Sequence, residues 1–274
     1  MSTLDCNKLR ALIYKETGML FEDKKDYYIS ARVQQRMEKT GSKSFNEYYH
    51  TLLFSNPRDE LQRFIEAITI NETYFFRDFP QLQGFAEKVL PPYLERKKTA
   101  RDLKLKIWSA ACSTGEEAYT LSIIFQEMID DYSKWNTEIL ATDVDRNVLD
   151  HASKGLYGER SMKDTPLPYK QKYFLRQDDE WQVLKHTKDP IKFLQLNFID
   201  RLAMRSIQGL DFVFCRNVLI YFDDDSRKKV INSLYDSLNP GGYLFLGHSE
   251  SIGRITAAFE LQNVGGFLCY RRPL

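Results

Sequence analysis

A turn of small residues followed by two acids is the part of the chain best suited to chemistry. Residues 109–117 read Ser-Ala-Ala-Cys-Ser-Thr-Gly-Glu-Glu and overlap the end of a predicted strand over residues 105–110. Open α/β sheets bind ligands at the carboxyl ends of their strands, and small residues let the backbone approach a ligand closely. The stretch therefore predicts a nucleotide-type cofactor site between a strand and a helix.

The composition of this turn narrows the choice of cofactor. It contains neither GxGxxG nor Gly-Lys-Ser/Thr, so neither a dinucleotide pyrophosphate turn nor a P-loop is predicted. Glu116 and Glu117 would repel phosphates and could accept hydrogen bonds from a cationic amino group. This favours S-adenosylmethionine, which carries an ammonium and a sulfonium but no phosphate. An ordinary strand-turn-helix, with acids that complement the helix dipole, is the alternative.

Two later strand ends also carry polar residues. Residues 138–145 read as a strand ending in acids, and Asp143 stands where related folds hold ribose hydroxyls. Residues 210–222 form an apolar run that contains Arg216, Asn217 and Tyr221. An unpaired polar group costs roughly 1 to 3 kcal/mol on burial, so Arg216 and Asn217 need partners. A ligand or a carboxylate could supply the pairing, and a purely structural Arg-Asp pair is the alternative.

Five blocks in order along nearly the whole chain resemble the signature blocks of the CheR family, the bacterial chemotaxis receptor glutamate O-methyltransferases. They are residues 71–77, 109–119, 141–143, 215–222 and 247–251. The resemblance implies a Rossmann-like class I methyltransferase sheet, with S-adenosylmethionine as cofactor and S-adenosylhomocysteine as product. The acceptors would be glutamates of chemoreceptor cytoplasmic helices, methylated in sensory adaptation. A cofactor-binding scaffold, or a methyltransferase of a related signalling array, is the alternative function.

The resemblance also implies roles for individual residues. Arg77 and Tyr221 would lie near the transferred methyl group as the catalytic residues. The cofactor would be held by Asn71, Thr73 and Arg77 at the methionine end, Glu117 at the amino group, Asp143 at the ribose, Asn197 and Phe198 at the adenine, with Arg216 and Asn217 completing the pocket. Family members commonly have Leu at the position of Phe198, so a backbone contact is expected there and the role of the side chain stays open.

The expected chemistry needs little acid-base help. A glutamate side chain of unperturbed pKa about 4.3 is already ionised at neutral pH, so no general base is required. The site must align a carboxylate oxygen with the methyl group and displace water. Arg and Tyr side chains suit that task, although too strong a salt bridge would stabilise the ground state and slow the transfer.

Composition agrees with a globular enzyme. The chain has 274 residues, net charge +1 and 43% hydrophobic residues, enough for an α/β core and a small extra domain. It has no apolar run of membrane-spanning length, and its first residues do not resemble a signal peptide. Its four cysteines and four histidines show no metal-binding spacing. We expect a cytoplasmic monomer with no metal and no membrane insertion.

The chain is predicted to divide into an all-helical domain over residues 1–76, a linker helix over 77–100 and a methyltransferase domain over 101–274. Helix patterns end at Gly18 and Gly41, and the linker helix is expected to begin at Pro80 and to end before Pro91. Strands over residues 105–110, 139–141, 193–196, 212–215, 243–247 and 267–270 predict a doubly wound sheet. Residues 172–175 and 181–184 predict a small antiparallel β-subdomain inserted at about 157–192.

The second helix carries a basic face opposite its apolar one. Arg32, Arg36 and Lys39 share that face, and residues 24–43 contain six basic and two acidic residues. A locally basic face suits an acidic partner, and the family's receptor helices are such a partner. An ordinary solvated helix face is the alternative.

Some family members grip a peptide at the receptor's carboxyl terminus through this β-subdomain, with a glycine-rich turn. Residues 176–181 read Arg-Gln-Asp-Asp-Glu-Trp, which has no glycine and three adjacent acids. Acids would repel a peptide's carboxyl end, and an edge strand needs a permissive turn to present its backbone. We therefore expect no dependence on a carboxyl-terminal pentapeptide tether.

Three other functions fit parts of the sequence. A methyltransferase acting on nucleic acid or a small molecule is disfavoured, because the chain has neither an Asn/Asp-Pro-Pro-Tyr motif nor a strongly basic overall charge. A nicotinamide dehydrogenase is disfavoured by a turn with one glycine. An idle scaffold that binds cofactor and receptor is disfavoured by the presence of both Arg77 and Tyr221.

Overall fold

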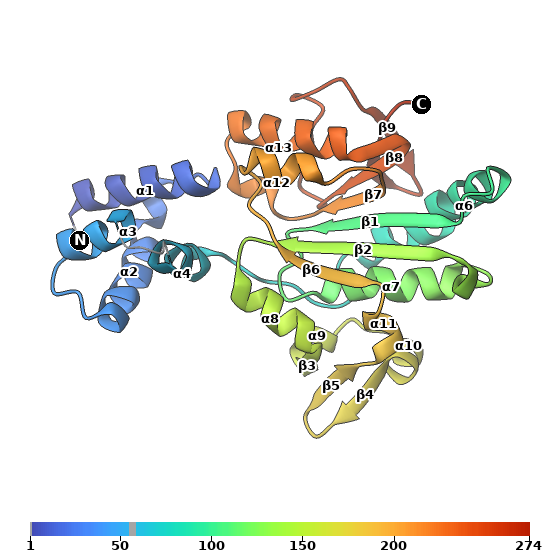
Figure 1. Cartoon of the computed structure of the whole chain (residues 1–274), viewed down its shortest axis with the longest axis horizontal. Helices are drawn as coiled ribbons and strands as arrows, with labels where there is room; N and C mark the ends of the chain where they lie inside the picture. The colour runs from blue at the N-terminus through green and yellow to red at the C-terminus, as the bar shows by residue number, and fades with distance from the viewer. Residues whose placement is uncertain (1, 55–58) are drawn as a thin grey trace.

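The amino-terminal part of the chain is helical (Figure 1). The computed structural model describes residues 2–54 and 59–274, and the helices of this part are α1 (Thr3–Thr17), α2 (Asp26–Thr40), α3 (Phe45–Phe54) and α4 (Asp59–Ile68), with a 3-10 turn, η1 (Asp23–Lys25). Ser2 and Asp5 form a capping box that begins α1. Gly18 and Gly41 end α1 and α2 in the left-handed conformation, with φ of 74° and 73°. The sequence predicts both ends, and the structure confirms them.

A helical segment with an irregular middle leads to the sheet. It consists of α5 (Phe79–Gly84), a π-helical turn, η2 (Phe85–Val89), and α6 (Leu90–Thr99). The predicted helix end before Pro91 is wrong, because the prolines occupy the first turn of α6, where an amide hydrogen has no helical acceptor. Phe85 packs edge-on against Phe212, Phe214 and Phe245, each at 5.1 Å between ring centres. The segment predicted as a linker therefore covers part of the sheet.

Within residues 59–274, a seven-stranded sheet has the order β6-β2-β1-β7-β8-β10-β9. Its strands are β1 (Lys104–Ala110), β2 (Asn136–Asp143), β6 (Ile191–Gln195), β7 (Leu210–Cys215), β8 (Leu238–Leu246), β9 (Glu260–Val264) and β10 (Phe267–Arg271). The first five in the sheet order run parallel, and β10 and β9 are antiparallel to their neighbours. The chain moves outward from β1 to β2 and β6, then returns to β7 on the other side of β1. This reversal places a ligand crevice at the carboxyl ends of β1 and β7.

Helices cover both faces of the sheet (Figure 1). One face carries α7 (Glu116–Met128), α8 (Arg146–Lys154) and the α5–α6 segment, and the other carries α12 (Arg201–Ser206) and α13 (Asp224–Ser237). Along β7, Phe212 and Phe214 belong to the core of the first face, whereas Val213 and Cys215 belong to that of the second. Every residue of β7 is buried, and all but Asp211 are apolar, as is typical of a sheet buried on both faces. The predicted doubly wound fold class is confirmed.

A small antiparallel sheet is inserted after α8. Its strands, in the order β3-β5-β4, are β3 (Leu156–Gly158), β4 (Phe174–Gln177) and β5 (Glu180–Val183). The short helices α9 (Glu159–Met162), α10 (Leu167–Tyr173) and α11 (Lys185–Lys188) accompany it, and a 3-10 turn, η3 (Tyr132–Lys134), precedes β2. The predicted antiparallel subdomain is therefore present. Two details differ: residues 172–173 end α10 instead of beginning a strand, and the sequence does not predict β3.

The segment that follows α1 is hydrogen-bonded to the loop that follows β7. Met19 and Phe222 form an antiparallel bridge, and the amide of Leu20 donates to the carbonyl of Tyr221 at 2.8 Å. These backbone contacts hold the helical part against the carboxyl edge of the sheet.

The domain limits 1–76, 77–100 and 101–274 stay a prediction. In the described ranges, no helix combines the length and apolar character needed to cross a membrane.

Candidate functional site

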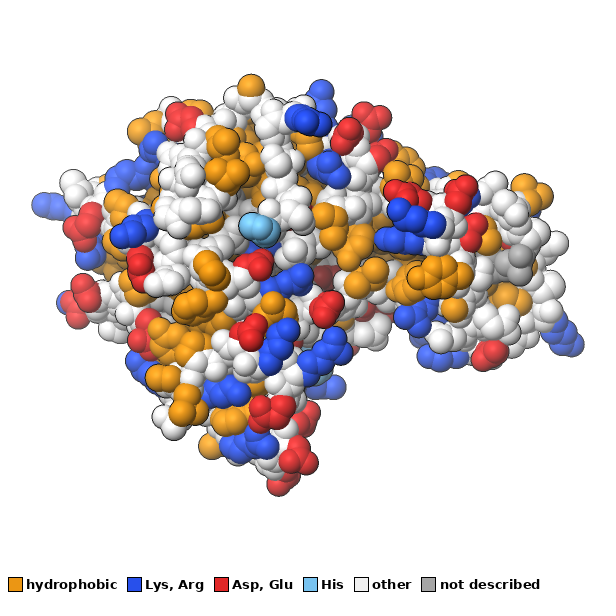
Figure 2. Space-filling view, turned by 180° about the vertical axis from the view of Figure 1, so that it is seen from behind, with side chains coloured by type: hydrophobic (Ala, Val, Ile, Leu, Met, Phe, Trp, Pro, Cys, Tyr) orange, Lys and Arg blue, Asp and Glu red, His pale blue; other side chains and the backbone are white. Residues whose placement is uncertain are grey.

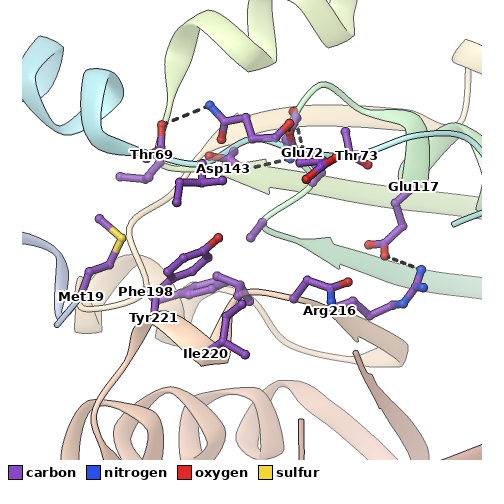
Figure 3. Close-up of a pocket in the computed structure, with 18 of the residues that line it drawn as sticks. Met19, Thr69, Glu72, Thr73, Glu117, Asp143, Phe198, Arg216, Ile220 and Tyr221 are labelled. Atoms are coloured by element: carbon purple, nitrogen blue, oxygen red, sulfur yellow. Dashed lines mark hydrogen bonds and ion pairs between the residues drawn. The ribbon is translucent and has the colours of Figure 1, made fainter. Parts of the chain in front are cut away.

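A cavity of about 340 Å³ gathers the residues that the sequence singles out (Figure 3). It lies at the carboxyl ends of β1, β2, β6 and β7, and residues 17–21 and 68–77 form its other wall. Every residue predicted for cofactor binding or catalysis lines it, namely Asn71, Thr73, Arg77, Glu117, Asp143, Asn197, Phe198, Arg216, Asn217 and Tyr221. The fold thus brings together segments that are far apart in the sequence.

The turn after β1 has an unusual backbone. Ala111 and Ser113 adopt positive φ angles of 63° and 49°, a region that residues other than glycine seldom occupy. Gly115 has φ 94°, and a Cβ atom there would lie 2.7 Å from Cβ of Ala152 on α8. Such conformations persist where the surrounding structure enforces them, often at ligand sites. The turn therefore brings α7 close to α8 and presents its backbone to the cavity.

Asp143, at the end of β2, is buried and holds this turn in place. Its carboxylate accepts the backbone amides of Ser113 at 2.9 Å and of Asp145 at 3.0 Å. Burial raises the pKa of Asp143 to about 6, while the amide hydrogen bonds lower it and the charge of Asp145 adds to the rise. A carboxylate has about four acceptor sites, so Asp143 can still receive hydroxyl groups from the cavity.

The two acids at the start of α7 point in different directions. Glu116 is buried away from the cavity, where two hydroxyl groups donate to it. Glu117 lines the cavity and accepts hydrogen bonds from Ser109 at 2.7 Å and from Arg216 at 3.1 Å. Burial raises the pKa of Glu117, and the charge of Arg216 opposes that shift. Of the two acids, Glu117 is the one placed to meet an ammonium group.

Arg216 is nearly fully buried and is paired by carboxylates of the protein. Its guanidinium contacts Asp78 at 2.6 Å and Glu117 at 3.1 Å, and Figure 3 draws the second of these bonds. It also donates to the carbonyl of Arg77 at 2.8 Å. The sequence left a ligand or a carboxylate as possible partners, and two carboxylates supply the charge. Arg216 thereby fixes Glu117 and the backbone of Arg77 at the cavity wall.

Arg77 and Tyr221 reach the cavity from different segments. Nη1 of Arg77 donates to the carbonyl of Glu72 at 2.7 Å, and its guanidinium lies 5.8 Å from the ring centre of Tyr74. Tyr221 ends the 3-10 turn η4 (Leu219–Tyr221), and its hydroxyl points into the cavity in Figure 3. Burial raises the pKa of Tyr221, and the charge of Arg77 opposes the shift. Tyr221 is therefore a neutral hydrogen-bond donor at neutral pH.

The side-chain nitrogens of two asparagines predicted to bind the cofactor form hydrogen bonds within the protein. Asn71 donates to the carboxylate of Asp145 at 2.9 Å, and Asn197 donates to the carbonyl of Glu16 at 2.7 Å. Asn217 adopts a positive φ of 58°. The side-chain amides of Asn71 and Asn197 thus help to hold these residues in place at the cavity wall.

Apolar residues of the helical part complete the cavity. Met19, Phe21, Ile68 and Ile70 line it, and Figure 3 labels Met19 and Phe198 among the lining side chains. The sequence does not single these residues out, because the same residue types fill every protein core. Their only signal is their position beside Gly18 and beside the block at residues 71–77.

The basic face of α2 is less uniform than its sequence indicates. Arg36 forms a bidentate ion pair with Glu60 of α4, in which Nε donates to Oε1 at 2.9 Å and Nη2 to Oε2 at 2.5 Å. The side chain of Arg36 is only 12% exposed. The hydroxyl of Tyr48 donates to the same carboxylate at 2.9 Å. Arg36 therefore joins the helices of this domain and is not a free charge for a partner. Arg32 stacks over Tyr28, and Lys39 is exposed.

The cavity fits a nucleoside that carries an amino acid. Asp143 offers acceptors for a ribose diol, Glu117 offers a carboxylate for an ammonium group, and Phe198 and Met19 offer apolar surface for a base. Nε of the buried Arg216 has no hydrogen-bond partner among the described residues, so the wall retains an unsatisfied donor. Within the same residues, no group of His, Cys, Asp and Glu could hold a metal ion.

The doubly wound sheet and this cavity, with an acid at the end of β2 and no phosphate-binding turn, define an S-adenosylmethionine-dependent methyltransferase. Comparison with protein families agrees. Residues 71–265 match the family described as CheR methyltransferase, SAM binding domain, and residues 4–69 match CheR methyltransferase, all-alpha domain. The chain belongs to the CheR methyltransferase family, as its five sequence blocks indicate.

Relatives match over nearly their whole length. Chemotaxis protein methyltransferase 2 of Vibrio cholerae is 38% identical over 98% of this chain and 93% of its own. Chemotaxis protein methyltransferase of Borreliella burgdorferi is 34% identical over 90% of this chain and 88% of its own. Chemotaxis protein methyltransferase 1 of Pseudomonas aeruginosa is 32% identical over 97% of each chain.

Proposed function

We propose that the protein transfers the methyl group of S-adenosylmethionine to glutamate side chains in the cytoplasmic helices of chemoreceptors, as an adaptation enzyme of chemotaxis. The names of its full-length relatives support this acceptor class. The observation that carries the proposal is that Arg77 and Tyr221 share one cavity with Glu117 and Asp143. The enzyme would act in the cytoplasm as a monomer.

Each cofactor contact follows from a group at the cavity wall. Asp143 would bind the ribose hydroxyls and Glu117 the amino group, with Arg216 holding Glu117 in place. Residues 71–77 would line the methionine end, the backbone of residues 197–198 the adenine, and residues 216–217 would complete the wall. S-adenosylhomocysteine should bind about as well, because nearly all these contacts go to groups that the two molecules share.

The reaction is a displacement at carbon that needs no base. Bound S-adenosylmethionine supplies an electrophilic methyl group, so that a C–O bond to the glutamate forms while the C–S bond breaks and its electron pair goes to sulfur. The acceptor is ionised at neutral pH, so no proton has to be removed. Alignment by Arg77 and Tyr221 would then be the main contribution, worth up to about 7 to 11 kcal/mol in well-oriented systems. The neutral Tyr221 hydroxyl can orient a carboxylate without pairing its charge.

Arg32 and Lys39 remain candidates for receptor binding on α2. Both belong to the basic face, and neither forms a buried ion pair like that of Arg36. Exposed basic residues attract an acidic helix over a screening length of about 8 Å at physiological ionic strength. On the face drawn in Figure 2, acidic and basic side chains are interspersed, which does not favour nucleic acid as a substrate there.

We further propose that the enzyme works without a receptor tail peptide. The turn between β4 and β5 consists of Asp178 and Asp179, and Asp178 takes a positive φ of 50° without being glycine. Arg176, beside this turn, is held by Glu159 and by the carbonyl of Asp178. Titration of the pentapeptide typical of receptor carboxyl termini should give no binding heat up to high micromolar concentration. A low-micromolar dissociation constant would contradict this proposal.

A labelled-methyl transfer assay on receptor-rich membranes tests the main proposal, with base-labile label as the sign of a methyl ester. Tyr221→Phe should lower turnover and leave the affinity for S-adenosylhomocysteine nearly intact, because it removes one hydroxyl group. Arg77→Ala should damage both, since Arg77 is proposed to touch cofactor and acceptor. Lys228→Glu, on the exposed surface of α13, serves as a control. Wild-type turnover in both site variants would place the methyl group elsewhere.

A further inference from the structure

Glu250 gathers three backbone amides around one carboxylate. It follows β8 in the block at residues 247–251. Its Oε2 accepts the amides of Gly247 at 2.7 Å and Asn217 at 2.8 Å, and its Oε1 accepts that of Ile220 at 3.3 Å. None of the proposed contacts to cofactor or acceptor uses this residue. The bonds join the end of β8 to the loop after β7.

That loop carries residues of the cavity wall. Asn217 and Tyr221 both line the cavity, and Asn217 has a positive φ of 58°, which is uncommon outside glycine. Loop amides with no carbonyl partner need another acceptor, and a charged acceptor makes the stronger hydrogen bonds. Glu250 supplies it at two points of the loop, one on each side of Val218 and Leu219.

The contact between Glu250 and the loop also explains why residue 247 is a glycine. A Cβ atom at this position would lie 2.8 Å from Oε2 of Glu250 and 2.9 Å from the backbone nitrogen of Asn217. Glycine is therefore needed here to let β8 and the loop approach each other. The Gly and the Glu of this block act as one unit, in which the glycine makes room and the carboxylate binds.

The loop is held on its other side by the helical part. The amide of Leu20 donates to the carbonyl of Tyr221 at 2.8 Å, and Met19 bridges to Phe222. Glu250 thus holds the beginning of the η4 turn, and residues 19–20 hold its end. A side chain on so short a turn has little freedom once both ends are fixed.

We propose that Glu250 is a positioning residue for methyl transfer, whose carboxylate fixes the 217–221 loop and so places the hydroxyl of Tyr221. The proposal rests on the function given above, in which Tyr221 orients the acceptor. Glu250→Gln keeps the side chain's size but replaces one acceptor oxygen by a donor. That donor would face an amide hydrogen, so at least one of the three bonds is lost. Glu250→Ala removes all three.

Amide hydrogen exchange of the cofactor-free protein tests the holding of the loop directly. The amides of Asn217 and Ile220 should exchange slowly in the wild type and faster in Glu250→Gln and Glu250→Ala. Asp225→Asn, which alters an exposed carboxylate in the first turn of α13, should leave their exchange unchanged. Equal protection in wild type and Glu250 variants would overturn the proposal.

Kinetics tests the consequence for catalysis. Misplacement of a group by about 1 Å can cost about 100-fold in rate, so kcat should fall by about 10- to 100-fold in Glu250→Gln. In a Tyr221→Phe background the same substitution should cost much less, because residues that act through one another are not additive. Full additivity, or a kcat within twofold of wild type, would refute the positioning role. Absence of methyl transfer by the wild type would instead refute the proposed function itself.

Discussion

Asp143 should make cofactor binding depend on pH. Burial raises the pKa of its carboxylate to about 6. The carboxylate accepts hydrogen bonds from two backbone amides. The shift from 3.8 to about 6 means that folding disfavours the ionised form by about 3 kcal/mol. This penalty is absent below pH 3.8 and fully present above pH 6. Ribose hydroxyls that donate to the carboxylate would offset part of it.

The direction of the effect follows from the form that binds. Hydroxyl groups donate to the ionised carboxylate, so the complex has a lower pKa at Asp143 than the free protein. Affinity for S-adenosylhomocysteine should therefore fall as the pH drops through about 6. With a free pKa of about 6, the ionised fraction falls about tenfold between pH 7 and pH 5, and the dissociation constant should rise by about that factor.

Calorimetric titration from pH 5 to pH 8 measures this dependence. Asp143→Asn should flatten the profile, because it removes the titrating group at nearly constant size, and Asp143→Ala should weaken binding by about 1 to 3 kcal/mol at pH 7.5. Asp225→Asn is the matched control and should keep the wild-type profile. A slope that persists in Asp143→Asn would assign the titration to another group, such as Glu117. Unchanged affinity in Asp143→Ala would refute the ribose assignment.

Three further substitutions test other parts of the structure. Lys39→Glu should raise the receptor KM and flatten its salt dependence without changing cofactor affinity, and normal methylation across salt concentrations would show that this face is only solvated. Glu60→Ala should cost about 3 to 5 kcal/mol of unfolding free energy in urea titrations, because it leaves Arg36 buried and unpaired; a loss below about 1 kcal/mol would contradict this. Gly84→Ala should cost about 1 to 3 kcal/mol, since the new Cβ would lie 2.7 Å from Cδ1 of Phe267, and full stability would show that this ring moves freely.

Local sequence patterns predict those helix ends that depend on a single residue type. Gly18 and Gly41 end helices because glycine adopts the left-handed conformation at the lowest cost in free energy. A single glycine in the sequence is therefore enough to predict such a helix end. Pro91 misled the prediction, because a proline marks the first turn of a helix as well as its end, and the π-helical turn before it has no sequence signature. Strand β3 was missed because three residues are too few to show a period.

Local sequence patterns do not show which carboxylates pair with the buried arginines. The sequence showed that Arg216 needs a partner, yet Asp78 and Glu117 stand far from it along the chain, and only the fold brings them within bonding distance. Arg36 shares its helix face with Arg32 and Lys39, and its burial depends on Glu60 from another helix. Charge spacing along one helix identifies a face and not what covers it. The cavity residues were found because five blocks resemble a known family.

The backbone contact between residues 19–20 and residues 221–222 limits how the enzyme can be recombined. A chimaera that joins the helical part of one relative to the sheet of another at residue 70 would pair a foreign backbone segment with the loop that carries Tyr221. The side chains of residues 19–21 would also be exchanged in the cavity wall. Receptor preference and turnover should therefore be inherited together unless residues 17–21 are kept with the sheet. In this chain the helical part supplies a piece of the cavity wall in addition to being attached to the sheet.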